Sequence, residues 1–321
     1  MLRHLLCWKF GFYGLLLPAL RRLGPARADA VLGGLGRLIA TLWPPRRREL
    51  TRSLERAKHA LDASWSPDAV RPALAANWVR FLARDLLLDA ANDADVLARF
   101  EVRGDAELRA AMGPGRGAIL VGSHLGGHVA ALHWMVRRGV PLRLLVQRPR
   151  HVSRTLDRHF DLPGPHPQSG FFLRRDLAPG LATERMLRAR SALRDGLAVY
   201  LSGDIPWSGP NTRPGRLLGR PQPFLSVWAD LAVLTRAPVF FTFCTHLPGG
   251  RYALSIEPLG TLAPGDEEPA VARYLARLES EVAAHPADAV PHLLWPCYAP
   301  PAPRRAPAPL PHRRVATAAQ S

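Results

Sequence analysis

The chain has 321 residues, enough for one large domain or two small ones, and its 47% hydrophobic content allows a sizeable core. Its three cysteines, Cys7, Cys244 and Cys297, are far apart and odd in number, which excludes a disulfide framework or a cysteine metal cluster. The formal net charge is +17, from 43 Lys and Arg against 26 Asp and Glu, so the surface attracts anionic lipid, acidic protein or nucleic acid.

The N-terminal apolar stretch covers residues 5–20 and is interrupted only by Lys9. It is shorter than the ~20 residues that span a bilayer, and its aromatic side chains suit the headgroup level. These features favour a membrane anchor or an interfacial helix. A cleaved signal peptide ending at "ARA" (26–28) is one alternative, but Arg21 and Arg22 lie between the apolar run and that site. A buried helix is the other.

A second apolar stretch, residues 31–43, ends at the basic sequence "PPRRR" (44–48). Arginines beside an apolar helix are expected where the helix meets anionic headgroups, although a core helix followed by a solvated charge run has the same pattern. We therefore predict a membrane-associated helical segment over residues 1–48, attached to an anionic surface. A helical region is expected over 50–112.

The pattern changes at Gly117, where short apolar runs begin to alternate with helical segments. Such alternation predicts an α/β domain, residues 49–298, with a mostly parallel sheet flanked by helices. The tail, 299–321, is rich in Pro and Arg and is predicted to be disordered. The expected strands are 118–121, 142–146, 197–201, 239–243 and 252–256, and the expected helices are 127–137, 181–194, 224–235 and 269–284.

The segment "GAILVGSHLGGHVAALHWMVRRG" (117–139) places His124 where the first of these strands ends and a helix is about to begin. Ligands of α/β sheets bind at this edge, and a neutral imidazole accepts a proton from a hydroxyl near pH 7. Gly126 and Gly127 are expected to let a substrate approach the backbone. The helix N-terminus is expected to offer N–H groups to an oxyanion. A histidine that merely caps the helix is the simpler alternative.

This segment resembles the first block of the lipid A late acyltransferases, within the lysophospholipid acyltransferase superfamily. The resemblance continues in order through four further blocks and covers roughly residues 5–295. These blocks are "LRLLVQRPRHVSRTLDRHF" (142–160), "ALRDGLAVYLSGDIPWSG" (192–209), "GRLLGRPQPFLSVWADLAVLTRAPVFFTFC" (215–244) and "RYALSIEPL" (251–259).

The resemblance implies a fatty acyl transfer from acyl carrier protein or acyl-CoA to a hydroxyl of a membrane glycolipid or lysophospholipid, without a cofactor, at the cytoplasmic face of the inner membrane. His124 is then the general base. Asp204 matches an acidic position of the family and would shape the pocket. The residues implied to hold substrate phosphates are Arg148, Arg174, Arg175 and Arg216, the last near Gly219.

One departure from the family matters. Its histidine is followed five residues later by Glu or Asp, and this chain has Val129 there. Loss of an orienting carboxylate can cost up to ~10⁴ in rate. His128 is the local candidate to orient His124, and Asp204 or Asp105 are candidates from elsewhere in the chain. A catalytically weakened, lipid-binding homologue is the alternative function.

Other chemistries fit less well. His124 and His128 share the spacing of two metal ligands, but no third ligand is evident, so no metal is expected. No nucleotide-binding loop or serine elbow follows a strand. The arginines are scattered and no nucleic-acid-binding module is recognisable, which disfavours a nucleic-acid partner, and an unrelated basic binding protein is the last hypothesis.

Overall fold

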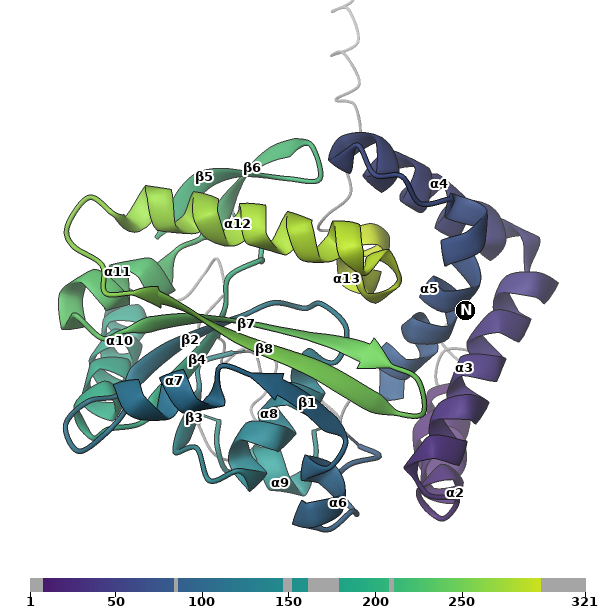
Figure 1. Ribbon diagram of the computed structural model, residues 1–321, viewed down its shortest axis with the longest axis horizontal. Coiled ribbons are helices and arrows are strands. Elements are labelled where there is room, and N and C mark those ends of the chain that lie inside the picture. The colour runs from purple at the N-terminus through teal and green to yellow at the C-terminus, as the bar shows by residue number, and fades with distance from the viewer. Residues whose placement is uncertain (1–7, 84–85, 147–151, 161–178, 208–210, 296–321) are drawn as a thin grey trace, which may run out of the picture.

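The computed structural model describes residues 8–83, 86–146, 152–160, 179–207 and 211–295 (Figure 1). The described chain begins with a layer of helices and continues into an α/β domain. The first helices are the π-helical η1 (Phe10–Leu16), α2 (Leu17–Arg21), α3 (Pro25–Leu42), α4 (Pro44–Leu61) and α5 (Pro67–Ala83). The later ones are α6 (Asp93–Leu97), α7 (Asp105–Ala111), α8 (His128–Arg137), α9 (Arg154–Asp157), α10 (Pro179–Arg194), α11 (Val227–Thr235), α12 (Glu267–Ala284), η2 (Pro286–Asp288) and α13 (Val290–Leu294).

A six-stranded sheet forms the centre of the α/β domain, in the order β1-β8-β7-β2-β4-β3. Its strands are β1 (Phe100–Arg103), β2 (Ala118–Gly122), β3 (Leu142–Leu144), β4 (Ala198–Ser202), β7 (Val239–Leu247) and β8 (Arg251–Gly260). All pairs are parallel except β7 with β8. The predicted α/β class with a mostly parallel sheet is confirmed. β1 lies inside the region expected to be wholly helical.

Helices cover both faces of the sheet, and β2 shows why its sequence is apolar throughout. Ile119 and Val121 pack into one core with side chains of α10, α11 and α12, whereas Leu120 packs into a second core that includes side chains of α7, α8 and α9. Alternate residues of a strand point to opposite faces, so a central parallel strand needs apolar residues at every position. The prediction of a buried strand at this point is confirmed.

A second, two-stranded sheet was not predicted. β5 (Thr212–Leu217) and β6 (Arg220–Leu225) form an antiparallel hairpin. Leu218 and Gly219 make its turn with φ of 50° and 75°. Two successive positive φ values are typical of the type I′ turn, which matches the twist of the flanking strands. Part of this hairpin, residues 224–225, was assigned by the sequence pattern to the helix that begins at Val227.

The N-terminal helices lie together at one end of the sheet (Figure 1). The side chain of Arg80 on α5 donates to both carboxylate oxygens of Asp29 on α3, at 2.7 and 2.8 Å, and to Asn77, which in turn donates to Asp288 of η2. These polar contacts join the helical layer to the α/β domain. Within the residues described, no helix combines the length and apolar character needed to cross a membrane. The predicted boundary between the membrane-associated segment and the α/β domain, at residue 48, falls inside α4.

Candidate functional site

The site lies at the carboxyl edge of the sheet, where two neighbouring parallel strands end side by side. Gly122 of β2 is in register with Ser202 of β4. His124 follows β2 by two residues, and Asp204 follows β4 by two residues. Because of this register, the two side chains lie next to each other at the carboxyl ends of the strands. This is where α/β sheets bind their ligands.

His124 and Asp204 are joined by two hydrogen bonds. Nδ1 of the imidazole lies 2.9 Å from Oδ1 of the carboxylate, and the backbone N–H of His124 donates to Oδ2 at 2.6 Å. The Asp204 side chain is fully buried, whereas 18% of the His124 side chain is exposed. An ionised carboxylate can only accept hydrogen bonds, so His124 carries its proton on Nδ1. The other ring nitrogen, Nε2, then keeps its lone pair and can accept a proton.

A second histidine holds the other side of the same carboxylate. Nε2 of His292, on α13, lies 2.7 Å from Oδ2 of Asp204, and both side chains are fully buried. Burial raises the pKa of Asp204, but the charges and hydrogen bonds of His124 and His292 outweigh it and hold that pKa well below its usual range. The carboxylate thus stays ionised at neutral pH. Nothing in the sequence around His292 marked it as a site residue.

Close packing explains why glycines precede both functional side chains. A Cβ on Gly203 would lie 2.6 Å from the Val121 side chain and 2.7 Å from the Tyr274 ring, and one on Gly122 would overlap the Tyr200 hydroxyl. Tyr274 also donates to the carbonyl of Gly122 at 2.7 Å. Only glycine lets the ends of β2 and β4 approach each other closely enough for the histidine and the carboxylate to meet.

The two glycines after β2 do not leave the space for a substrate that the sequence led us to expect. The space beside Gly126 and Gly127 is filled by protein, because a Cβ would meet the Cys244 carbonyl at 2.5 Å and the Tyr252 ring at 2.5 Å respectively. Their N–H groups donate to the carbonyls of Asp288 and Cys244, both at 2.9 Å. These glycines therefore allow the turn to pack closely against β7 and η2, and their N–H groups are hydrogen-bonded to carbonyls of the protein.

The His124 ring lies beside two other rings, and a third packs behind one of them. Its ring centroid lies 5.1 Å from that of His128 and 5.4 Å from that of Trp295, and Phe81 of α5 stacks on His128 at 5.5 Å. The helical layer thus contributes directly to the site. The sequence singled out His128, but it did not indicate Phe81 or Trp295, which come from segments far away in the chain.

Val129 occupies the position of the family carboxylate. It packs, partly buried, against the core on the α8 side of the sheet. Asp204 bonds Nδ1 of His124 instead, so the geometry favours the remote aspartate over His128 as the orienting group. Asp105 forms ion pairs with Arg109 and Arg138 and is not that partner.

The predicted arginines fall into two groups. Arg148, Arg174 and Arg175 lie outside the described residues. Arg216 and Gly219 belong to the β5–β6 hairpin, where Gly219 forms the turn and Arg216 is exposed. Within the described part of the chain, no group of three His, Cys, Asp or Glu side chains could hold a metal ion.

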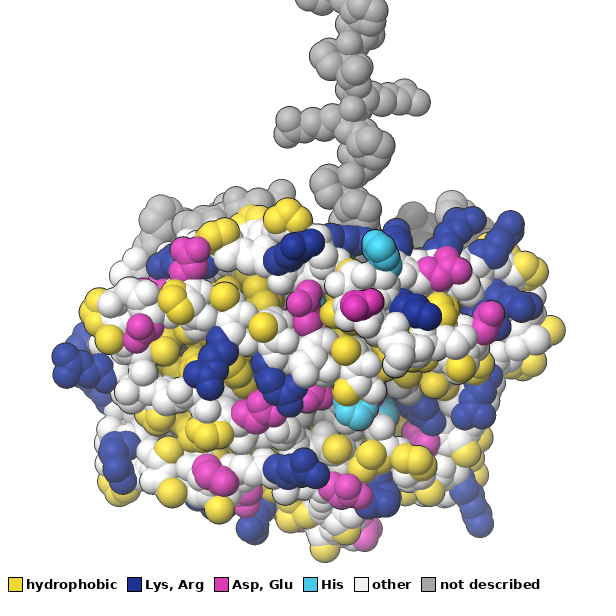
Figure 2. Space-filling view, turned by 45° about the horizontal axis from the view of Figure 1, so that its top comes forward, with side chains coloured by type: hydrophobic (Ala, Val, Ile, Leu, Met, Phe, Trp, Pro, Cys, Tyr) yellow, Lys and Arg dark blue, Asp and Glu magenta, His cyan; other side chains and the backbone are white. Residues whose placement is uncertain are grey.

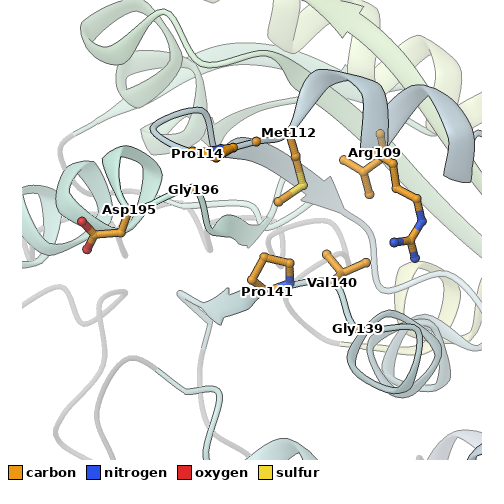
Figure 3. Close-up of a pocket in the computed structure, with 10 residues that line it drawn as sticks. Arg109, Met112, Pro114, Gly139, Val140, Pro141, Asp195 and Gly196 are labelled. Carbon is orange, nitrogen blue, oxygen red and sulfur yellow. The ribbon is translucent and has the colours of Figure 1, made fainter.

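A separate pocket of about 390 Å³ lies at the opposite edge of the sheet (Figure 3). Its lining includes Met112, Val140, Pro141 and Gly196, which precede or lie beside the amino ends of β2, β3 and β4. Because His124 follows the carboxyl end of β2, this pocket is not part of the histidine–aspartate site.

A mostly parallel sheet with a partly exposed histidine and a buried, ionised aspartate at its carboxyl edge defines the class of this protein as an α/β enzyme. The chain matches the family described as bacterial lipid A biosynthesis acyltransferase over residues 1–290. It belongs to that family, whose members are membrane-associated acyltransferases. A search of curated proteins found no match.

Proposed function

We propose that this protein transfers a fatty acyl group from acyl carrier protein or acyl-CoA to a hydroxyl of a membrane glycolipid or lysophospholipid, with His124 as the general base. The observation that carries the proposal is the 2.9 Å contact between Nδ1 of His124 and Oδ1 of Asp204. It provides the orientation and charge compensation that a base histidine needs, and it does so at the ligand-binding edge of the sheet.

The reaction follows from the tautomer of His124. Nε2 accepts the proton of the acceptor hydroxyl as its oxygen attacks the thioester carbonyl carbon. The imidazolium that forms is stabilised by the ionised Asp204. When the tetrahedral intermediate collapses, the carbon–sulfur bond breaks and the leaving thiolate takes the proton from Nε2. Atoms and charge balance without a cofactor.

The candidate donors for the tetrahedral oxyanion are an arginine and the N–H groups in the first turn of α8. The N–H groups of Gly126 and Gly127 bond to carbonyls of the protein. His124 N–H donates to Asp204, and Leu125 N–H to the Ser123 hydroxyl. The N–H groups of residues 124–127 are therefore bonded within the protein, whereas α8 begins at His128 and the N–H groups of a first helical turn have no acceptor within their helix. Arg148, which the family resemblance implies to be a substrate-binding residue, is our candidate for the arginine.

The presence of Asp204 bears on the alternative of a weakened, lipid-binding homologue. That alternative rested on Val129, because valine can neither orient nor compensate an imidazole. The carboxylate that does so now comes from the end of β4 and is held by three hydrogen bonds, two from His124 and one from His292. This arrangement supports the active acyltransferase.

We propose that the helical layer attaches the enzyme to the cytoplasmic face of the inner membrane. Leu38 and Leu42 of α3, and Trp43 after it, have 53%, 70% and 54% of their surface exposed. Arg47 and Arg48, at the start of α4, are also exposed. Figure 2 shows basic and apolar side chains interleaved at the end of the molecule formed by α3 and α4. Such a surface suits an anionic interface, into which apolar side chains insert while arginines contact phosphates.

Transfer of radiolabelled acyl groups from acyl carrier protein or acyl-CoA into membrane lipid tests the proposal. Wild type should incorporate label, and His124→Ala should lose at least about a thousandfold of that rate. His285→Ala changes a histidine whose side chain is 47% exposed and should match wild type. If His124→Ala retains the wild-type rate, His124 is not the base.

A further inference from the structure

A second histidine–aspartate pair lies at the same edge of the sheet. His246 is near the end of β7, the parallel neighbour of β2. Its Nδ1 lies 2.6 Å from Oδ1 of Asp288, and its backbone N–H donates to Oδ2 at 3.3 Å. His124 and Asp204 are joined by the same two kinds of contact. The proposed reaction uses only the His124 pair.

The Asp288 carboxylate bonds to elements on two sides. It is buried, with 5% of its side chain exposed, and besides His246 the side-chain amide of Asn77 on α5 donates to Oδ1 at 3.0 Å. The same amide donates to the carbonyl of Ala287 at 3.0 Å, and its oxygen accepts from Arg80. η2 is thereby bonded to β7 on one side and to the helical layer on the other.

The main chain at Asp288 bonds to the turn that carries the proposed base. Its carbonyl accepts the N–H of Gly126, two residues after His124, at 2.9 Å. A Cβ on Gly126 would lie 2.5 Å from the Cys244 carbonyl and 3.0 Å from Oδ1 of Asp288. The turn is packed so closely against η2 that a movement of η2 displaces it.

Asp288 also precedes the helix that holds the partner carboxylate. α13 begins two residues later, and its His292 bonds to Asp204 at 2.7 Å. Figure 1 shows α13 between the end of α12 and α5, and α13 contacts α5. His124 and Asp204 are thus both connected to the backbone around Asp288, one through Gly126 and the other through His292.

A buried carboxylate is an expensive means of joining three elements. Its desolvation must be offset by hydrogen bonds, and apolar side chains of similar volume often give equal or greater stability. Hydrogen bonds are directional, however, so a fully bonded carboxylate fixes one arrangement of the elements around it. Such precision matters at a site of proton transfer, where a misplacement of about 1 Å can cost about a hundredfold in rate.

We propose that Asp288 is a positioning residue for acyl transfer, which acts through Gly126 and His292 on the contact between His124 and Asp204. His246 and Asn77 hold its carboxylate in place. The inference rests on the proposed function and adds residues of β7, α5 and η2 to those on which the reaction depends.

A double-mutant cycle with Asp204→Asn tests the proposal by steady-state acyl transfer. Asp288→Asn replaces an accepting oxygen with an N–H donor and should lower kcat about tenfold, with KM changed by less than about twofold. In the Asp204→Asn background the contact is already broken, so Asp288→Asn should lower kcat by less than about twofold further. Asn77→Leu should show the same pattern with a smaller loss, which gives a second test if Asp288→Asn folds poorly.

Leu278→Ala is the matched structural control, since Leu278 is fully buried on α12 and its truncation weakens the core without removing a hydrogen bond. It should lower the unfolding temperature and change kcat by less than about twofold in either background. Asp266→Asn alters an exposed aspartate and should leave kcat unchanged. Equal losses from Asp288→Asn in both backgrounds, or no loss in either, would overturn the positioning role.

Proton NMR follows the same contact without turnover. The Nδ1–H signal of His124, assigned by its absence in His124→Ala, should broaden through exchange with water in Asp288→Asn and stay sharp in Leu278→Ala. An unchanged signal in Asp288→Asn refutes the positioning role and leaves the proposed function standing. If wild type transfers no acyl group from either donor, the proposed function fails, and the NMR comparison still supports or refutes the effect of Asp288 on the contact.

Discussion

Nδ1 of His124 lies 2.9 Å from Oδ1 of Asp204, although the two residues are 80 positions apart in the chain. The parallel register of β2 and β4 brings them together, and His292 holds the other oxygen of the carboxylate. Because the family carboxylate at position 129 is replaced by valine, this contact decides whether His124 can act as a base.

Asp204→Asn should lower kcat by about 10³–10⁴-fold, because an amide neither fixes the imidazole tautomer nor compensates the imidazolium charge. Steady-state acyl transfer measures the change. Asp195→Asn, which alters an exposed acid at the end of α10, should leave kcat unchanged. A loss of less than about tenfold in Asp204→Asn would show that this carboxylate does not assist the base.

The lowered pKa of Asp204 also predicts how stability depends on pH. The unfolded chain protonates an aspartate near pH 3.9, above the folded pKa of Asp204, so the unfolded state takes up the proton first as the pH falls. The contribution of Asp204 is therefore complete above about pH 5 and is lost below pH 3.9 at about 1.4 kcal/mol per pH unit.

Urea unfolding at pH 3 to pH 6 measures this effect as the difference between wild type and Asp204→Asn. The other carboxylates are common to both proteins, so the difference isolates Asp204. As the pH falls, the free energy of unfolding of wild type should decrease relative to that of Asp204→Asn. Parallel pH profiles for the two proteins would contradict a lowered pKa.

Val129→Glu should not raise the rate of acyl transfer. Nδ1 of His124 is already bonded to Asp204, and Val129 packs against apolar side chains. A carboxylate placed there loses hydration, which should cost about 1–3 kcal/mol of stability. Kinetics and thermal unfolding give the two readouts, with Val129→Ile as the apolar control. A faster Val129→Glu enzyme would mean that the remote aspartate is an insufficient substitute.

His292→Leu should reduce kcat about 10–100-fold with little change in KM, since it removes one hydrogen bond to a buried, charged carboxylate. His292 is a positioning residue, because it reaches the imidazole only through Asp204. His292→Gln keeps an N–H donor and should restore most of the rate. Equal kcat values for the Leu and Gln variants would argue that His292 has a packing role alone.

The exposed apolar side chains of the helical layer should govern membrane attachment. A triple variant in which Leu38, Leu42 and Trp43 are each replaced by Glu should bind anionic vesicles at least about tenfold more weakly. Each apolar side chain that is buried in the membrane contributes on the order of 1 kcal/mol or more. Co-sedimentation with phosphatidylglycerol-containing vesicles measures the binding. Leu234→Glu is the control, because Leu234 is 58% exposed on α11. Unchanged vesicle binding by the triple variant would show that these three residues do not form the membrane-binding surface.

Local patterns identified much of the fold. Continuous apolar runs such as β2 and β4 predict buried strands, because a central strand contacts core on both faces. β1 was missed because a four-residue strand with two exposed positions, Glu101 and Arg103, has almost no periodic signal. The β5–β6 hairpin was missed because its strands contain Pro214, Pro221 and Pro223, which ordinarily argue against a strand.

By itself, the sequence determined the class of the fold, the family and the position of His124, since each depends on order and spacing along the chain. It raised His128, Asp204 and Asp105 as partners for that histidine but could not choose among them. Only the tertiary structure made that choice, and it added His292, Phe81 and Trp295 from distant segments. The physical reason is that a hydrogen bond between residues 80 positions apart depends on strand register and on close packing at two glycines, and neither leaves a periodic trace in the sequence.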